Sequence, residues 1–143
     1  FNLSAFAEAA ACYERALALA PGEATAEQGR LLARLARARA FLGDAEGAGR
    51  LYEQGLALAE AAGDRRLSAD SSYELGALAQ RAGALGRARP LLEGALAAYT
   101  ALDDRAAQAR TLNRLGALLI ELDDAEGALK CYQRALDLGR RRG

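Results

Sequence analysis

The chain has 143 residues, of which 19 are basic and 19 acidic, so its formal net charge at pH 7 is zero. Such a balance gives no overall field that would draw the protein onto nucleic acid or an anionic membrane, and the length suits a single domain. The sequence has no run of about 20 apolar residues and no signal-peptide pattern at its start, so we expect a cytoplasmic protein that spans no membrane.

Helices are expected along the whole chain. Hydrophobic residues make up 52% of the sequence, and Ala and Leu supply nearly all of them; Ile120 is the only isoleucine, and valine is absent. Ala and Leu favour helices, whereas the β-branched residues that favour strands are scarce. We predict helices over residues 4–20, 26–42, 45–62, 66–82, 85–101, 105–121 and 125–141.

One pattern of small and large residues recurs at a nearly constant interval. Ala-x-x-x-Tyr/Leu-x-x-Ala/Gly begins at Ala9, Ala48, Ala88 and Ala128, and its first and last copies overlap the similar segments CYERALAL and CYQRALDL. A second pattern, Leu-x-x-Leu-Gly, starts at Leu112 and occurs in looser form from Ser72 and from Leu32. Spacings of three and four place these residues on one helical stripe, and the small residue lets a neighbouring helix approach closely. The repeated unit is therefore a first helix (A), a tight turn and a second helix (B).

Turn residues stand where this unit needs them. Gly accepts the left-handed conformation that ends a helix, and Asp caps the next helix by accepting hydrogen bonds from free backbone N–H groups. Inside the units the turns are Gly43-Asp44, Gly83-Ala84 and Asp123-Asp124, and between the units they are Pro21-Gly22, Gly63-Asp64 and Asp103-Asp104. Thr25 followed by Gln28 predicts a capping box at the start of the second unit.

These residues resemble the tetratricopeptide repeat, whose pattern is W-x-x-L-G-x-x-Y, then A-x-x-x-F, then P. The chain matches the Leu-Gly and Ala-x-x-x-aromatic parts of that pattern. The resemblance implies an all-α, right-handed superhelical solenoid of antiparallel helix pairs, with about seven helices in a single repeat domain. The expected division is a half repeat at residues 1–22 and full repeats at 23–63, 64–103 and 104–143.

The chain also departs from the family pattern. No Trp stands at any first position, Arg39 replaces an aromatic residue, and only Pro21 matches the closing proline. The repeat is longer than the usual length of about 34 residues. In this it resembles the subclass found in kinesin light chains, cell-polarity adaptors and many bacterial signalling proteins and transcription regulators, and we expect a bacterial source.

Both ends of the sequence look unfinished for a stacked array. The first unit lacks its helix A, and the last helix B runs into residues 139–143 with no polar capping helix after it. Stacked repeats need capped ends, so we expect an internal segment of a longer array. Self-association through an open end is the alternative.

The two cysteines occupy the same place in the first and last units. Packed helices stand about 8–10 Å apart, so three repeats should separate Cys12 from Cys131 by far more than the roughly 7 Å that a disulfide allows. The chain has no His, which leaves a zinc site without its usual ligands. We expect both cysteines to be small apolar core residues, in positions where Leu51 and Leu91 stand in the other units.

The sequence predicts neither catalysis nor a cofactor. His, the commonest general base, is absent, Lys130 is the only lysine, and no Gly-rich phosphate loop or nucleophile elbow occurs. The adjacent carboxylates Asp103 and Asp104, like Asp123 and Asp124, lie at helix starts, where capping explains them. We therefore expect no catalytic residue, no metal and no cofactor, and a protein that is not an enzyme.

The candidate binding residues lie on helix A of each unit, which lines the concave surface in the family. Alignment of the units on their shared patterns gives two rows that alternate in sign. The first row is Arg30, Asp70 and Arg110, and the second row is Arg34, Glu74 and Arg114.

Two interpretations of these rows remain open. One is a ladder of interhelical ion pairs, each worth about 0–1 kcal/mol when exposed. The other is a polar floor that holds a peptide of mixed charge, since the Arg fork grips carboxylates with two hydrogen bonds. Asn113 resembles the asparagines that often hold a peptide backbone in the family. The candidate peptide-binding residues are Arg30, Arg34, Arg37, Asp70, Tyr73, Glu74, Arg81, Arg110, Asn113 and Arg114.

Two clusters of arginine invite a nucleic-acid interpretation. The arginines of residues 30–39, RLLARLARAR, share one helix face with no interleaved aromatic platform, and the chain has no net charge. Arg140 to Arg142 lie in a last helical turn, where cations complement the helix dipole. We expect no binding to nucleic acid.

Two functions follow from these patterns. The first is a non-catalytic scaffold that binds a peptide or partner segment in the concave groove formed by the A helices. The alternative is a regulatory or self-assembly segment of a larger signalling or transcription-regulator protein.

Overall fold

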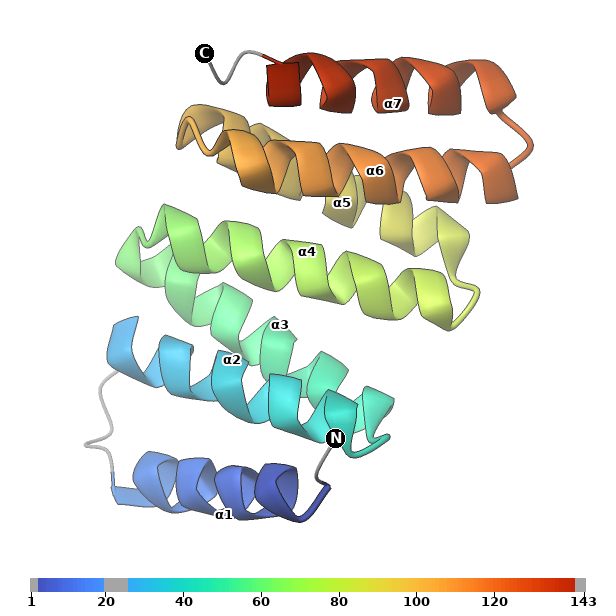
Figure 1. Cartoon of the computed structure of the whole chain (residues 1–143). Coiled ribbons are helices and arrows are strands. Elements are labelled where there is room, and N and C mark those ends of the chain that lie inside the picture. The colour runs from blue at the N-terminus through green and yellow to red at the C-terminus, as the bar shows by residue number, and fades with distance from the viewer. Residues whose placement is uncertain (1–2, 20–25, 141–143) are drawn as a thin grey trace. The chain divides into compact units, whose positions relative to one another are not determined.

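The computed structural model describes residues 3–19 and 26–140, and all regular elements within them are α-helices (Figure 1). In chain order, the seven helices of these residues are α1 (Leu3–Leu19), α2 (Ala26–Phe41), α3 (Ala45–Ala62), α4 (Arg65–Arg81), α5 (Leu85–Ala101), α6 (Arg105–Glu121) and α7 (Ala125–Arg140). Their ends agree with the predicted ranges to within one residue. The predicted turn at Pro21-Gly22 and the Thr25 side of the capping box lie outside the described residues.

Aspartate side chains begin four of the helices. Asp44, Asp64, Asp104 and Asp124 each accept a hydrogen bond from the backbone N–H three residues further on, at 2.9–3.0 Å. These bonds satisfy donors that a helix start otherwise leaves without a partner. Helix α5 differs, because Ala84 precedes it and forms no side-chain cap.

The turns before these caps use the left-handed backbone conformation. Gly43, Gly63 and Gly83 have φ angles of 88°, 71° and 81°, and Asp103 and Asp123 have φ angles of 54° and 63°. Asp tolerates this region better than most residues with a side chain. In each Asp-Asp pair, the first residue therefore ends one helix and the second caps the next.

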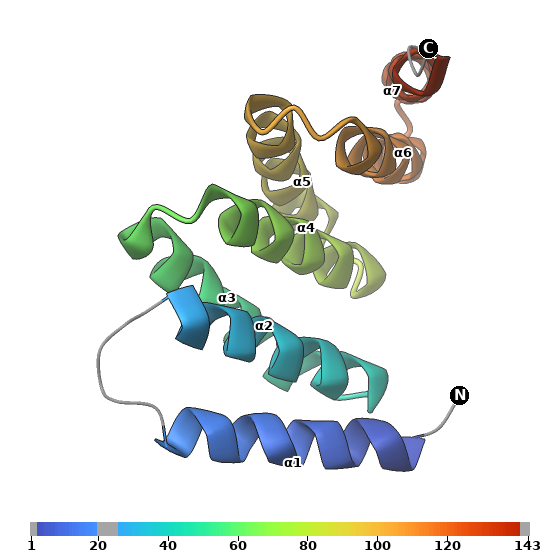
Figure 2. The same cartoon turned by 60° about the vertical axis from the view of Figure 1, so that its left-hand side comes forward.

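The chain divides into two compact units, Phe1–Ser71 and Ser72–Gly143, and helix α4 contributes its first part to one unit and its second part to the other. In the first unit, α2 packs against α1 and α3; in the second unit, α6 packs against α5 and α7. Figure 2 shows α6 and α7 side by side, and Figure 1 shows that they run in opposite directions. Consecutive helices thus form antiparallel hairpins within each unit.

In the first unit, the packed side of α1 meets α2. Leu35 and Ala38 of α2 form a cluster with Ala10 of α1, and the half-buried side chains of Tyr13 and Leu17 pack against it. Of the α1 repeat pattern, this cluster contains Tyr13, and its other α1 members, Ala10 and Leu17, lie next to the pattern positions Ala9 and Ala16.

In the second unit, two glycines lie directly against large side chains of a neighbouring helix. A Cβ atom on Gly76 would lie 2.7 Å from Cγ of Leu92, and a Cβ atom on Gly116 would lie 2.7 Å from Cζ of Tyr132. Real Cβ atoms do not come this close to their neighbours, so the large side chains occupy the space that the glycines leave. The close approach predicted from the Leu-Gly pattern is confirmed.

The prediction that both cysteines are core residues is wrong for Cys12, which is exposed. Cys12 follows Ala10 by two residues and precedes Tyr13 by one, which turns it about 100° away from the tyrosine around the helix axis. It therefore lies off the side of α1 that faces α2. Its Sγ atom accepts a contact from Nη2 of Arg15 at 3.6 Å, on the exposed surface.

Cys131 on α7 is only half-buried, as are Leu51 and Leu91 at the equivalent positions of α3 and α5. Partial burial raises the pKa of the Cys131 thiol, because desolvation disfavours the thiolate; the nearby guanidinium of Arg134 opposes this shift. Both cysteines are free thiols.

Replacement of Leu115 by Asp should unfold the second unit. Leu115 is 5% exposed on α6, so the variant buries a carboxylate and loses core contacts, at a cost of about 2–5 kcal/mol. Ala128→Arg should be similarly destabilising through overpacking, since Ala128 is 2% exposed. Thermal unfolding followed by circular dichroism measures both effects. The control is Leu129→Asp at a position that is 57% exposed, which should change Tm little. Parent-like stability of Leu115→Asp would contradict the placement of this residue in the core.

Introduction of a cap at the start of α5 should stabilise the protein. Ala84→Asp gives this turn the acceptor that Asp supplies at the starts of α3, α4, α6 and α7, and should raise the free energy of unfolding by about 1 kcal/mol. Urea denaturation at neutral pH measures the change. Ala84→Val has no acceptor and serves as the control; an equal gain from valine would show that capping is not the cause.

The two thiols should differ in their reaction with iodoacetamide. Cys12 is exposed, whereas Cys131 is half-buried with a raised pKa, so a smaller fraction of Cys131 is thiolate at pH 7.5. Mass spectrometry on the single-thiol variants Cys12→Ser and Cys131→Ser should show several-fold slower alkylation of Cys131. The difference should vanish in urea, and equal rates in the folded protein would refute the assigned environments.

Candidate protein-interaction groove

The ten candidate binding residues lie on the A helices α2, α4 and α6. Helix α2 carries Arg30, Arg34 and Arg37, helix α4 carries Asp70, Tyr73, Glu74 and Arg81, and helix α6 carries Arg110, Asn113 and Arg114. Regular helical spacing along each helix sets their positions, as expected from the repeat pattern.

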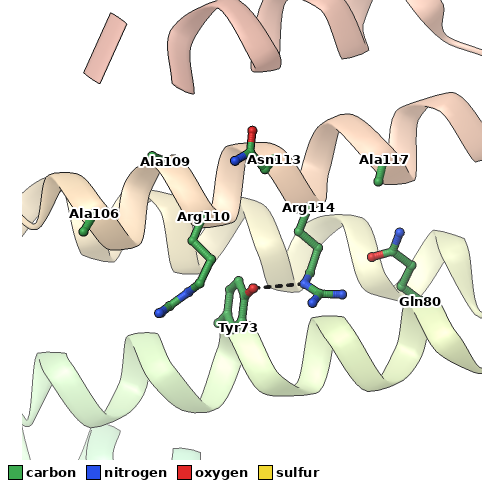
Figure 3. A pocket seen from close by; sticks show the side chains of 8 residues that line it. All are labelled: Tyr73, Gln80, Ala106, Ala109, Arg110, Asn113, Arg114 and Ala117. Atoms are coloured by element: carbon green, nitrogen blue, oxygen red, sulfur yellow. Dashed lines mark hydrogen bonds between the residues drawn. The ribbon is translucent and has the colours of Figure 1, made fainter. Parts of the chain in front are cut away.

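In the second unit, an open groove of about 590 Å³ lies along α4 and α6. It brings together four of the candidate residues: Tyr73, Arg110, Asn113 and Arg114 (Figure 3). Four further residues complete the lining: Gln80, Ala106, Ala109 and Ala117. The alanines leave room along α6 on both sides of the two arginines.

The ring of Tyr73 organises the centre of the groove. The Cζ atoms of Arg110 and Arg114 lie 4.7 Å and 5.3 Å from its centroid. Nε of Arg114 also donates a hydrogen bond to the Tyr73 hydroxyl at 3.1 Å. Figure 3 shows the tyrosine between the two arginine side chains, which reach from α6 toward α4. A tyrosine that is only 7% exposed thus holds two guanidinium groups by cation–π contacts and one hydrogen bond.

The lining of the groove contains two positive charges and no carboxylate. Within residues 3–19 and 26–140, the partners of Arg110 and Arg114 are the rings of Tyr73 and Tyr99 and the Tyr73 hydroxyl. No ion pair to either arginine occurs there. Their guanidinium groups therefore retain free N–H donors that can bind an anionic group.

Gln80 and the three groove alanines were not among the residues predicted from the sequence. Nε2 of Gln80 donates a hydrogen bond to Oε1 of Glu121 at 3.4 Å. This bond orients the side-chain amide of Gln80, which lies next to Arg114 in Figure 3. A usable signal existed for two of the alanines, because Ala106 and Ala117 lie four residues before and seven residues after Arg110 and share its side of α6, away from the leucine stripe, whereas Ala109 borders that stripe. Small residues beside charged ones on that side indicate open space rather than core.

In the first unit, the candidate arginines of α2 are exposed. Arg30 pairs with Glu27 at 3.1 Å and with Asp64 at 4.0 Å. The guanidinium of Arg37 lies over the ring of Phe41 at 5.9 Å. Exposed ion pairs of this kind contribute little to stability.

The two sign-alternating rows extend across both units, so the ladder that they suggest stays a prediction. The ion pairs of Arg30 given above involve residues outside its row. In the second unit, Arg110 and Arg114 contact an aromatic ring that the rows do not include. Aromatic contacts therefore account for these two arginines better than carboxylate pairing does.

Two further properties of the described residues bear on function. No group of three or more His, Cys, Asp or Glu side chains within them is arranged to hold a metal ion. Among the same residues, none of the helices combines the length and the apolar character needed to cross a membrane.

Comparison with known proteins places this geometry in a family. The sequence model of the tetratricopeptide repeat matches residues 67–141, just over half of the chain. No curated protein matches the sequence significantly.

Two solved structures are similar to this chain. The crystal structure of BtubC (BKLC) from P. vanneervenii matches with a TM-score of 0.87 and 23% identity, over 96% of this chain and 57% of that one. A putative kinesin light chain with nearly identical tetratricopeptide-like repeats from Podosopora anserina matches with a TM-score of 0.80 and 19% identity, over 96% of this chain and 69% of that one. The chain thus spans little more than half the length of BtubC, and at these identities the likeness concerns the fold.

The expected all-α class and the resemblance drawn from the sequence are confirmed by these matches. The chain belongs to the tetratricopeptide repeat family, whose members generally act as non-catalytic scaffolds for protein–protein interaction.

Proposed function

We propose that this chain binds a peptide or an extended segment of another protein along the exposed side of its A helices. The observation that carries the proposal is the open groove of α4 and α6, in which Arg110 and Arg114 hold their guanidinium groups beside the ring of Tyr73 and Asn113 contributes to the lining. A groove lined by a few placed polar groups and by small apolar side chains is a common form of binding site.

The binding mechanism is preorganisation. A flexible ligand loses conformational entropy when it binds. Side chains of the protein that were free before binding would add to this entropy cost, whereas side chains already held in place add little. Tyr73 holds both guanidinium groups before any ligand is present, so their rotamer entropy is already reduced. The ordered helices supply a surface that need not fold on binding.

The charge of the exposed side favours a ligand with both signs. Arg30, Arg34 and Arg37 supply positive charge on α2, whereas Asp70 and Glu74 supply negative charge on α4. A partner segment that carries acidic and basic residues would complement these positions. Charged groups at an interface set the rate and the specificity of association more than its strength.

Reversal of one charge on α2 and one charge of the α4–α6 groove should abolish peptide binding without unfolding the protein. In the parent, a library of capped mixed-charge peptides should shift backbone amide resonances along α2, α4 and α6 in two-dimensional NMR spectra. The Arg34→Glu/Arg114→Glu variant should lose these shifts, because it repels the acidic residues of the ligand. Arg50→Glu/Arg134→Glu, with the same charge change on α3 and α7, is the matched control and should bind as the parent does.

Unchanged binding by the groove variant would refute the proposed surface. Light scattering on the same samples tests the alternative of self-assembly, which one observation favours: Leu129 and Leu136 of α7 are 57% and 60% exposed. An oligomer that grows with concentration, without any peptide response, would favour self-assembly through this helix.

A further inference from the structure

Helix α7 carries a leucine that the stacking of the repeats does not require. Leu129 is 57% exposed. At the same place in the repeat, α1 has the small residue Ala10, α3 has Gly49, and α5 has Arg89, whose side chain is exposed and pairs with Glu93. The other units thus place a small or a charged residue at this position. A leucine on the exposed side of α7 needs another explanation.

Leu129 belongs to an apolar seam along α7. Leu136 follows it by seven residues and is 60% exposed, and the half-buried Tyr132 lies between them. Within the described part of the second unit, the helix that packs against α7 is α6, with Ala128 and Ala135 buried (Figure 1). Spacings of three and four along one side of a helix form the kind of seam through which helices pack on one another. The seam of Leu129, Tyr132 and Leu136 therefore offers a surface to another helix.

A row of polar residues borders this seam. Its members are exposed and stand at alternating spacings of four and three residues: Glu126, Lys130, Gln133, Asp137 and Arg140. Helical periodicity places them in one stripe beside the seam. Their signs run acidic, basic, neutral, acidic, basic, so the row read backwards runs basic, acidic, neutral, basic, acidic. In a two-fold antiparallel pair of α7 helices, the row of one copy lies along the row of the other, and each charge meets its opposite.

Such a pair can be centred on Gln133. Glu126 then stands opposite Arg140 of the second copy, and Lys130 stands within one residue of Asp137 of the second copy. One residue is about 1.5 Å along a helix, a shift that these side chains can span. Because of the two-fold symmetry, each ion pair forms twice.

The seam agrees with the same register. Leu129 stands within one residue of Leu136 of the second copy, so apolar side chains meet in the middle and charges flank them. Within one copy, Lys130 pairs with Glu126 at 3.8 Å, with their side chains 72% and 86% exposed. An exposed pair of this kind contributes little, so both charges remain available to a second copy.

The alternating row is a feature of α7 and not of the repeat. At the place of Asp137, helices α1, α3 and α5 have Ala18, Ala57 and Ala97. The seam leucine Leu129 is likewise absent from those helices. The apolar and the charged parts of the surface therefore depart from the repeat pattern together.

We infer that α7 is a homodimer surface, on which two copies of this chain pair antiparallel through Leu129 and Leu136, with Glu126 of each copy bound to Arg140 of the other. Because each copy uses the same surface, assembly stops at two chains. One pair of short helices is smaller than a standard interface, so we expect a dissociation constant on the order of 100 µM. The inference goes beyond the proposed function and holds whether or not the groove binds a peptide.

Sedimentation velocity of the 143-residue chain tests the pairing, from roughly tenfold below to tenfold above the expected dissociation constant. The mass should rise from that of one chain to a plateau at two. Leu129→Asp should stay monomeric throughout, because it places a carboxylate in the seam. The matched control is Leu3→Asp, at a leucine of α1 that is 53% exposed, and it should pair as the parent does. Circular dichroism melts show that each variant is folded.

Charge reversals test the register. Glu126→Arg and Arg140→Glu should each weaken pairing about fivefold, since each opposes like charges twice in the pair. Glu126→Arg/Arg140→Glu restores opposite charges across the two-fold axis and should recover the dissociation constant of the parent. Binding to a different protein would be weakened further by the double reversal instead of being restored. Arg134→Glu, outside the row, should leave pairing unchanged.

A crosslink locates the two-fold axis. In a Cys12→Ser/Cys131→Ser background, Gln133→Cys should form a covalent dimer with a short bismaleimide linker, because its two thiols meet near the axis. Arg134→Cys lies about 100° further around the helix and should form little covalent dimer.

Four results would overturn the inference. They are a chain that stays monomeric at millimolar concentration, a mass that grows beyond two copies, equal loss of pairing in Leu3→Asp, and a double reversal that does not restore pairing. The first would mean that the seam has a different occupant, and the second would indicate open-ended stacking. None of them bears on the groove of α4 and α6, whose response to peptides is measured separately.

Discussion

The structure depends on the fit of a large side chain against a residue with almost none. Gly76 faces Leu92, and Gly116 faces the ring of Tyr132, at separations that would not admit a single extra carbon atom. In the first unit, Gly29 stands in the same relation to Leu67. Each contact lets two helix backbones approach, so the remaining leucine and alanine side chains touch across a short gap. A chain that relies on Ala and Leu, with few bulky core residues, needs this closeness to bury enough apolar surface.

The same close packing decides which side of α6 remains available for a ligand. Leu112, Leu115 and Leu119 are buried against neighbouring helices. Arg110, Asn113 and Ala117 lie outside that stripe and line the groove. One helix thus carries the core on one side and the polar groove on the other, as the 3.6-residue period requires. Because both sides belong to one rigid element, the packing that stabilises the second unit also fixes the positions of Arg110 and Arg114.

Most of the fold was predictable from the sequence, since its determinants are local and repeated. Gly and Asp mark the turns, and the regular recurrence of one pattern shows which residues share a role, so even the helix ends could be placed to within one residue. The exposure of Cys12 was not predictable in this way. Its repeat position is half-buried in α3, α5 and α7, but the position in the repeat does not by itself determine how far neighbouring helices cover that residue.

The groove was only partly predictable, for a different physical reason. Residue spacing placed Arg110 and Arg114 on the exposed side of α6, but it could not show whether they would turn toward a carboxylate or toward a ring. That choice depends on side-chain conformations and on the burial of Tyr73, which stands where the other two units have Ala33 and Asn113. A residue without an aromatic ring at this position would offer no cation–π contact, and the two guanidinium groups would be free to seek acidic partners on the protein itself.

The zero net charge of the chain does not limit the field inside this groove. Screening in physiological salt reduces interactions beyond about 8 Å, so a ligand in the groove responds to the charges that line it and hardly to the distant ones that balance them. The lining holds two guanidinium groups, two amides and no carboxylate. The nearby Glu121 already accepts a hydrogen bond from Gln80 through one of its carboxylate oxygens. A protein without net charge can therefore still present a locally positive site, because several of the acidic residues that balance its charge cap helices, as Asp104 and Asp124 do, or pair with other cations, as Glu46 and Glu126 do.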